Sequence, residues 1–290
     1  MIIFDKSLQL SINNNKPCIH KFLIKVCDQI KKPLLDVLFM SGKRKKVLLL
    51  LQDGPKGMDY LLKSLDTTRP ALLPQMRVLE DSNLIIHYND SYELTTIGKI
   101  LVEEIVPLLN TLEVFDVDID YWGNHKLMFA PRSLLSRLRE IKGCKVIEPN
   151  LVNIYEANKD FIETCATSKD LFFILTFAHP VFTTLSSQFI ANGSNIEIII
   201  NADLLQKFKA NWKKEVQGYI DSEKVKFYLY PNDIELGTFA QNDHCFVLRM
   251  LSNNKTYDYS QLFCNGPDAL KWGRELFDFY LKDSIPITEI

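Results

Sequence analysis

Basic side chains that could hold DNA phosphates are concentrated near residue 45. Four of them follow one another at the start of a predicted helix: Lys43, Arg44, Lys45 and Lys46. Cationic side chains beside a DNA-reading helix bind the phosphate backbone and add affinity without sequence information. A solvated helix end would explain the cluster equally well if it stood alone. Because a candidate recognition helix follows, a phosphate-binding role is favoured.

Side chains that could read base edges lie on the next long helical pattern. Arg69 can reach guanine and Gln75 adenine through bidentate hydrogen bonds, and Thr68 can bind a phosphate or a base edge. Arg77 is also predicted on the outward side of this helix. Pro74 removes one backbone hydrogen bond, so it either bends the helix along a groove or makes a plain kink.

The elements that position these side chains form the pattern of a winged helix-turn-helix. Three helical patterns precede a hairpin pattern, at residues 43–52, 58–65, 69–82 and 84–94. The recognition helix of such a motif enters the DNA major groove. In the hairpin, or wing, His87, Tyr88 and Asn89 are candidates for backbone or minor-groove contact. A structural role is the commoner one for any single residue there.

A heptad-like apolar stripe follows in a long predicted helix that ends at residue 115. Its members are spaced 4, 3, 4 and 3 residues apart: Leu101, Ile105, Leu108, Leu112 and Phe115. This is coiled-coil spacing, so the stripe predicts a homodimer seam. The alternative is that the stripe only packs onto its own domain. Pro107 lies inside the helix and should bend it.

The remaining chain predicts a second domain. Strand and helix patterns alternate after residue 140, which is typical of an α/β sheet with mainly parallel strands. The predicted fold class is an α+β winged helix-turn-helix followed by an α/β effector domain with a mainly parallel sheet. The predicted parts are an N-terminal extension at 1–31, the DNA-binding domain with its dimerisation helix at 32–115, a linker at 116–140 and the effector domain at 141–290.

A sensor site is expected at the strand ends of this second domain. Ligands of open α/β sheets bind beyond the carboxyl ends of the strands. The candidate residues are Glu148, Phe177, His179, Asn201, Trp212 and Tyr230. His179 could instead cap the following helix, and the whole domain could serve only to enlarge the dimer interface.

Composition narrows the function classes. The chain is 47% hydrophobic and 24% charged, with a net charge of −2, as in an ordinary globular protein. No long apolar run, signal peptide or nucleotide-binding motif is visible, so we expect a cytoplasmic protein with no membrane partner and no cofactor. The six cysteines contain no CxxC pair and the histidines are dispersed. We therefore expect no metal site and mostly free, buried thiols.

Several segments resemble the winged-helix regulators of methanogenic archaea that carry a FilR-type (DUF1724) effector domain. The resemblance rests on PLLDVLFMSGKRK (33–45), ALLPQMRVLED (71–81), LTTIGKI (94–100), PLLNTLEVF (107–115), DYW (120–122), FAHP (177–180) and WGRELFDFY (272–280). It implies an ArsR-like DNA-binding half and regulation of methanogenesis or methyl-metabolism genes. The metal-ligand motifs of ArsR metal sensors are missing.

Three functions therefore compete. The first is a homodimeric regulator that binds double-stranded DNA and responds to a small effector. The second is a DNA-targeted enzyme with a phospholipase D-like domain, which would need a His-x-Lys pair, whereas Pro-Val-Phe follows His179. The third is a winged-helix adaptor that binds proteins. A strong salt dependence of binding to duplex DNA would separate the first from the third.

Overall fold

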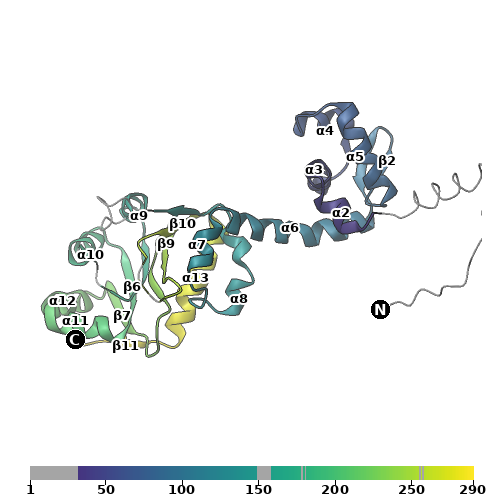
Figure 1. The fold of residues 1–290 in the computed structure, drawn as a ribbon. Helices are drawn as coiled ribbons and strands as arrows, with labels where there is room; N and C mark the ends of the chain where they lie inside the picture. Colours follow the sequence, from purple (N-terminus) through teal and green to yellow (C-terminus); the bar gives the residue numbers. More distant parts are fainter. Residues whose placement is uncertain (1–31, 149–157, 178, 180, 255, 257) are drawn as a thin grey trace, which may run out of the picture. The chain divides into compact units, whose positions relative to one another are not determined.

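The computed structural model describes residues 32–148, 158–177, 179, 181–254, 256 and 258–290 (Figure 1). The extension expected at residues 1–31 lies outside the described residues. The chain divides into two compact units at the bond between Val106 and Pro107. Each unit is described separately below.

Unit 1 contains the predicted helices and hairpin in the predicted order. Its elements are α2 (Leu34–Phe39), α3 (Gly42–Leu50), η1 (Leu51–Asp53), β1 (Lys56–Gly57), α4 (Met58–Ser64), α5 (Arg69–Asp81), β2 (Ile85–Tyr88) and β3 (Ser91–Leu94). The Ser41 hydroxyl accepts a hydrogen bond from the backbone N–H of Arg44 and caps α3, as N-cap serines commonly do. The helices bury one face each around Val47, Leu61 and Met76.

The hairpin turns at Asn89 and Asp90. Both have positive φ, at 46° and 61°, as a two-residue type I′ turn requires. β2 and β3 pair antiparallel, and β1 adds a third strand beside β3. The hairpin predicted over residues 84–94 is therefore confirmed.

Helix α6 (Thr96–Asp116) follows the hairpin. The Thr95 hydroxyl accepts a hydrogen bond from the Gly98 N–H at 3.0 Å, which caps the helix. At Gly98 the helix passes very close to the hairpin, because a Cβ built there would lie 2.1 Å from the carbonyl oxygen of Leu84. Only glycine fits this approach.

Unit 2 is built on a sheet in the order β11-β7-β6-β5-β8-β9-β10-β4. Its strands are β4 (Lys145–Ile147), β5 (Asp170–Leu175), β6 (Asn195–Ile200), β7 (Val225–Leu229), β8 (Leu236–Gln241), β9 (Cys245–Met250), β10 (Gln261–Asn265) and β11 (Ile285–Ile287). Only the β5–β6 and β6–β7 pairs are parallel, and the others are antiparallel. The prediction of a mainly parallel sheet is therefore wrong. The α/β alternation stops after β7, and β8, β9 and β10 follow without an intervening helix.

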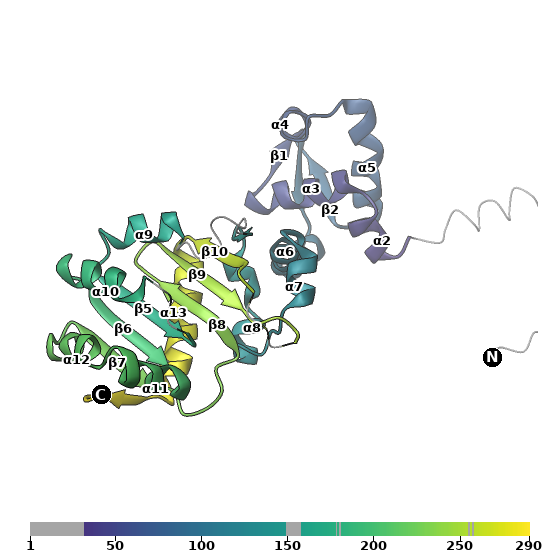
Figure 2. The same ribbon diagram turned by 60° about the vertical axis from the view of Figure 1, so that its left-hand side comes forward.

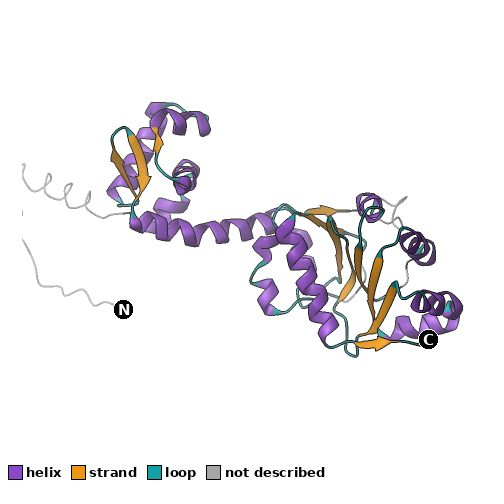
Figure 3. Cartoon of the chain, turned by 180° about the vertical axis from the view of Figure 1, so that it is seen from behind, coloured by secondary structure: helices purple, strands orange, loops and turns teal. Residues whose placement is uncertain are grey.

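Helices cover both faces of this sheet (Figures 2 and 3). They are α7 (Ile119–Asn124), α8 (Arg132–Leu135), η2 (Leu138–Ile141), α9 (Lys159–Cys165), α10 (Phe182–Ala191), α11 (Ala202–Asn211), α12 (Lys213–Asp221) and α13 (Pro267–Lys282). One core contains side chains of α7, α8, η2 and α13, and a second core on the opposite face contains those of α9 to α12. Alternate residues of each strand serve the two cores: Ile199 faces the first, and Ile198 and Ile200 face the second.

The segment 116–140, expected to be a linker, is part of unit 2. Tyr121, Trp122 and Phe129 are each at most 6% exposed within the first core. The Trp122 indole N–H donates to the carbonyl oxygen of Val114 at 2.9 Å. The prediction of a linker is therefore wrong. The aspartates and the glycine of this segment lie in or next to short helices that pack into the core.

The cysteines also differ from expectation. Cys144, just before β4, forms a disulfide with Cys264 in β10. Cys165 and Cys245 are buried free thiols, and burial raises the pKa of Cys165 to about 12. Cys165 and Cys245 thus behave as the small apolar side chains that were expected. Cys144 and Cys264 instead join the adjacent strands β4 and β10.

A histidine and an aspartate fix the loop between β9 and β10. The buried His125 ring lies 2.6 Å from the Tyr121 carbonyl oxygen through Nδ1 and 2.9 Å from the Asp258 carboxylate through Nε2. Burial raises the pKa of Asp258, but hydrogen bonds from the Ser260 N–H and hydroxyl, together with His125, outweigh it and hold the pKa below its usual value. His125 therefore has a structural partner.

Candidate functional sites

The basic cluster of unit 1 divides between the surface and the interior. Lys43 and Lys46 are exposed on α3, and Lys45 is half-buried. These three side chains remain available as phosphate contacts. Lys43 and Lys46 are three residues apart, so they lie on the same side of α3.

Arg44 has a different position from its neighbours, because it is only 7% exposed. Its Nε donates to the carbonyl oxygen of Val37 at 2.6 Å, and its Nη2 donates to that of Asp36 at 2.9 Å. Its Nη1 donates to Gln75 Oε1 at 2.8 Å. The guanidinium therefore joins α2, α3 and α5 inside the unit. We correct the phosphate role of Arg44 and the adenine-reading role of Gln75 to structural ones.

The outward face of α5 carries the remaining candidate readers. Thr68 and Arg69, at the N-terminus of the helix, and Arg77 are exposed, while Leu72, Met76 and Leu79 are fully buried. The helix runs without a break through Pro74, which is itself exposed. The exposed part of α5 therefore combines the cationic side chains of Arg69 and Arg77 with the apolar ring of Pro74.

The wing adds aromatic groups at its tip. His87 is exposed and stacks on Tyr92 with ring centroids 4.4 Å apart, and Asn89 is exposed in the turn. Tyr88, the third wing candidate, is 69% exposed.

The apolar stripe of α6 is used in two ways. Leu101 and Ile105 pack against the core of unit 1, and Phe115 packs edge-on against Trp122 in unit 2 at 5.4 Å. Leu108 and Leu112 remain 49% and 44% exposed. Only part of the predicted seam is thus available to a second copy of the chain.

The predicted effector residues do not form one crevice. Phe177 and His179 line one cavity, and Asn201 and Tyr230 line another hollow. Trp212 packs against Phe208 with ring centroids 5.9 Å apart. Glu148 is exposed at the end of β4. The single crevice is therefore corrected to two separate hollows.

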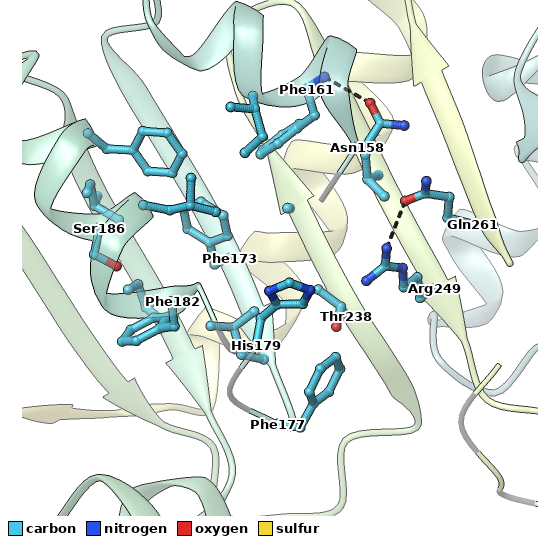
Figure 4. A pocket seen from close by; sticks show the side chains of 18 residues that line it. Asn158, Phe161, Phe173, Phe177, His179, Phe182, Ser186, Thr238, Arg249 and Gln261 are labelled. Carbon is cyan, nitrogen blue, oxygen red and sulfur yellow. Dashed lines mark hydrogen bonds between the residues drawn. The ribbon is translucent and has the colours of Figure 1, made fainter. Parts of the chain in front are cut away.

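The first cavity has a volume of about 120 Å³ and lies between the sheet and helices α9 and α10 (Figure 4). Its walls are mainly aromatic and aliphatic, with contributions from Phe161, Phe173, Phe177, Phe182, Phe189, Ile162, Leu175, Leu185, Ile196, Ile198, Ala240 and Val247. Asn158, Arg249 and Gln261 lie together on one side of it, opposite Phe182 (Figure 4). An apolar hollow with a few convergent polar groups is the usual form of a small-molecule site.

The polar side of this cavity was missed by sequence reasoning. Arg249 is only 8% exposed, and it is one of six residues of β9 that are all buried. Its Nη2 donates to Gln261 Oε1 at 3.3 Å. Thr238 is its partner in the register with β8. An arginine inside an otherwise apolar run, CFVLRM, was the available signal, since arginine is rarely buried without a specific reason.

The second hollow has a volume of about 420 Å³ and lies where β5, β6 and β7 end. Its lining is polar and includes Thr176, Asp203 and Asp233. Asn201 is already engaged there, because its side-chain oxygen accepts the Leu204 N–H at 2.9 Å and caps α11. This hollow has the position predicted for a ligand, but its lining is more polar than that of the first cavity.

The described residues include no group of three or more His, Cys, Asp or Glu side chains able to hold a metal ion. None of the helices in this part of the chain has the length and apolar character that a membrane crossing requires.

Comparison with known proteins identifies similar domains in both units. Residues 32–113 match the family model for the N-terminal domain of methanogenesis regulatory protein FilR1, and residues 154–283 match the model for its middle domain. The methanogenesis regulatory protein FilR1 of Methanothrix harundinacea (strain 6Ac) is 22% identical over 267 residues. The match covers 90% of this chain, which spans 59% of that relative's length.

Solved structures give weaker likenesses. The archaeal chromatin protein TrmBL2 is similar with a TM-score of 0.40 and 11% identity, over 92% of this chain and 99% of that one. The phospholipase D family member Nuc from Salmonella typhimurium has a TM-score of 0.36 and 9% identity, over 50% of this chain and 97% of that one. Scores this low carry no argument about fold or function. The chain is thus similar in sequence, in both units and in the same order, to the methanogenesis regulatory proteins of the FilR1 type.

Proposed function

We propose that this protein is a transcription regulator whose unit 1 binds double-stranded DNA as a winged helix-turn-helix. The observation that carries the proposal is that α5 buries Leu72, Met76 and Leu79 while Arg69, at its N-terminus, and Arg77 stay exposed. A helix supported in this way can enter the major groove. The sequence match to the FilR1 N-terminal domain supports the same role.

Exposed lysines on α3 would supply phosphate contacts. Lys43 and Lys46 are exposed on α3. Arg44 of the same helix is buried and donates a hydrogen bond to Gln75 of α5. The two helices are therefore held in a fixed relation, so that phosphate contacts from one set the register of the other on the duplex. The wing would add backbone or minor-groove contacts through His87 and Asn89.

The targets we propose are genes of methanogenesis or methyl-group metabolism. The support is the similarity to FilR1, which is named as a methanogenesis regulatory protein. Unit 2 would act as the receiver of a small-molecule signal. Its match to the FilR1 middle domain and its apolar cavity support this part of the proposal.

Arg77→Ala is expected to relax base preference at one position of the site. The cost should be about 1–3 kcal/mol against the preferred base pair, the range for loss of one good base contact. The measurement is binding to duplexes selected from a random DNA pool, compared with duplexes changed at single positions. Lys43→Ala is the matched control, because a lost phosphate contact weakens all sequences alike. Equal weakening of every duplex by Arg77→Ala would refute direct readout by this residue.

We also propose that the protein is a homodimer in which α6 contributes to the seam. Leu108 and Leu112 occupy successive turns of this helix and are close to half exposed. Side chains of this kind stabilise a helix pair when a second copy covers them.

Leu108→Lys combined with Leu112→Lys is therefore expected to give a monomer. Placing two charges in an apolar seam leaves them buried without partners, which costs several kcal/mol. Sedimentation equilibrium measures the result directly. Val117→Lys, at an exposed position just beyond α6, is the control and should leave the dimer intact. A dimer that survives the double change would place the interface elsewhere, with the exposed side of α2 as the next candidate.

A further inference from the structure

We propose that the cavity beside α9 and α10 binds a small aromatic carboxylate, with Arg249 holding the carboxylate group. The proposal deepens the receiver role of unit 2 and rests on it. It assigns the ligand a ring that fills the apolar part of the cavity and a negative charge at the polar side (Figure 4).

The walls favour an aromatic ring. Phe161 and Phe173 meet edge to face at 6.3 Å, and Phe173 and Phe189 lie nearly parallel at 6.5 Å. Aromatic side chains that line a hollow offer both ring faces and ring edges to a further ring. The cavity volume of about 120 Å³ is close to that of the apolar cavity of ~150 Å³ known to take benzene. A single six-membered ring is therefore the right size.

The polar side favours a carboxylate. The guanidinium of Arg249 presents five N–H donors in a planar fork. It can therefore bind a carboxylate through two parallel hydrogen bonds while keeping its protein partners. Gln261 Oε1 accepts a hydrogen bond from Nη2 of Arg249 at 3.3 Å. This contact fixes the direction of the guanidinium.

Thr238 supplies a second and independent indication. Its hydroxyl oxygen is buried and makes no hydrogen bond within the described residues, yet it lines the cavity on the strand next to Arg249. Buried polar groups nearly always have a partner. A carboxylate oxygen held by Arg249 would give this hydroxyl an acceptor.

The two faces of the same strands differ in how their polar side chains are satisfied. On the opposite face, Phe239, Leu248 and Leu262 are at most 1% exposed, and the buried Gln241 donates to the carbonyl oxygen of Leu270 at 2.9 Å. On the cavity face their neighbours along the strands are Thr238, Arg249 and Gln261. Burying a hydroxyl without a partner costs free energy, so the Thr238 hydroxyl at this cavity favours a ligand.

The test is isothermal titration of the full chain with benzoate, and with benzyl alcohol as a neutral probe of similar shape. Benzoate should bind one site per chain and more tightly than benzyl alcohol. Arg249→Met should weaken benzoate by about 10-fold or more, as loss of a charge-assisted hydrogen bond does, and should leave benzyl alcohol unchanged. Arg132→Met, at an exposed arginine on the opposite face of the sheet, is the matched control and should bind benzoate normally.

Ala240→Leu provides a second variant in case Arg249→Met fails to fold. Ala240 lines the cavity and is 7% exposed, so a larger side chain fills the space and should abolish binding of both probes. The proposal is overturned if benzoate does not bind the folded wild type. It is also overturned if Ala240→Leu binds benzoate normally, or if benzyl alcohol binds as tightly as benzoate.

DNA affinity measured with and without benzoate separates this site from the wider function. A change in affinity on adding benzoate supports both the site and the receiver role. Benzoate binding without such a change supports the site and refutes the receiver role. If benzoate does not bind while the chain still binds duplex DNA, the site is refuted and the regulator stands.

Discussion

Arg44→Met is expected to lower the free energy of unfolding of unit 1 by about 3 kcal/mol. The substitution removes charge-assisted hydrogen bonds to Val37 O, Asp36 O and Gln75 Oε1, each worth about 1.5–3 kcal/mol before the packing of methionine offsets part of the loss. It also removes the Arg44 donor from the carbonyl oxygen of the buried Val37, whereas the carbonyl oxygen of Asp36 still accepts the Met40 N–H. For a unit of this size the unfolding temperature should fall by more than about 10 °C.

Lys46→Met on the same helix is the matched control. Lys46 is exposed, so its loss should change stability by less than about 0.5 kcal/mol. Thermal unfolding followed by circular dichroism measures both variants. At a temperature where Arg44→Met remains folded, its DNA affinity should keep the wild-type salt dependence. A variant as stable as wild type but with a shallower salt dependence would return Arg44 to the phosphate-binding set.

Gly98→Ala is expected to destabilise unit 1 by about 2–3 kcal/mol. In an open helix this change stabilises by up to about 1 kcal/mol, but the new Cβ would lie 2.1 Å from the carbonyl oxygen of Leu84. The carbonyl oxygen of Leu84 already accepts hydrogen bonds from the N–H and the hydroxyl of Thr95, so it is held in place. Either α6 or the hairpin must shift, at the cost of an overpacked core.

Gly42→Ala provides the comparison within the same unit. Gly42 begins α3, and a Cβ there would meet no heavy atom within 4 Å. Its stability should stay the same or rise slightly. Chemical denaturation measures the difference between the two variants. Equal stability of Gly98→Ala and Gly42→Ala would show that the close approach at Leu84 does not constrain the helix.

The elements of unit 1 could be predicted from the sequence because their signals are local. The Asn89-Asp90 turn, the Thr95 cap and the periodicity of Leu72, Met76 and Leu79 depend only on neighbouring residues. Local signals do not say which basic residue of a cluster turns inward. Arg44 differs from Lys43 by one step of about 100° around α3, and the carbonyls that receive it belong to α2.

The sheet of unit 2 and its cavity depend on pairings between distant segments. Alternation of strands and helices predicted parallel pairing, but β5 also pairs antiparallel with β8, which is about 60 residues further along the chain. Residues 116–140 read as a linker because Asp, Gly and Pro are frequent there, although Tyr121 and Trp122 are core residues. Arg249 and Thr238 become neighbours only through the β8–β9 register, so the polar side of the cavity could not be predicted from spacing.

The proposal that unit 1 binds DNA is tested most directly by the salt dependence of affinity for a labelled duplex. Fluorescence anisotropy of the full chain at a series of salt concentrations gives the slope of log K against log[salt]. Each phosphate contact contributes about −0.9, so the exposed residues Lys43 and Lys46 predict a slope of about −2 or steeper per chain, reduced by about 1 in Lys46→Met. Absence of binding, or an affinity that does not change with salt, would contradict the DNA-binding role.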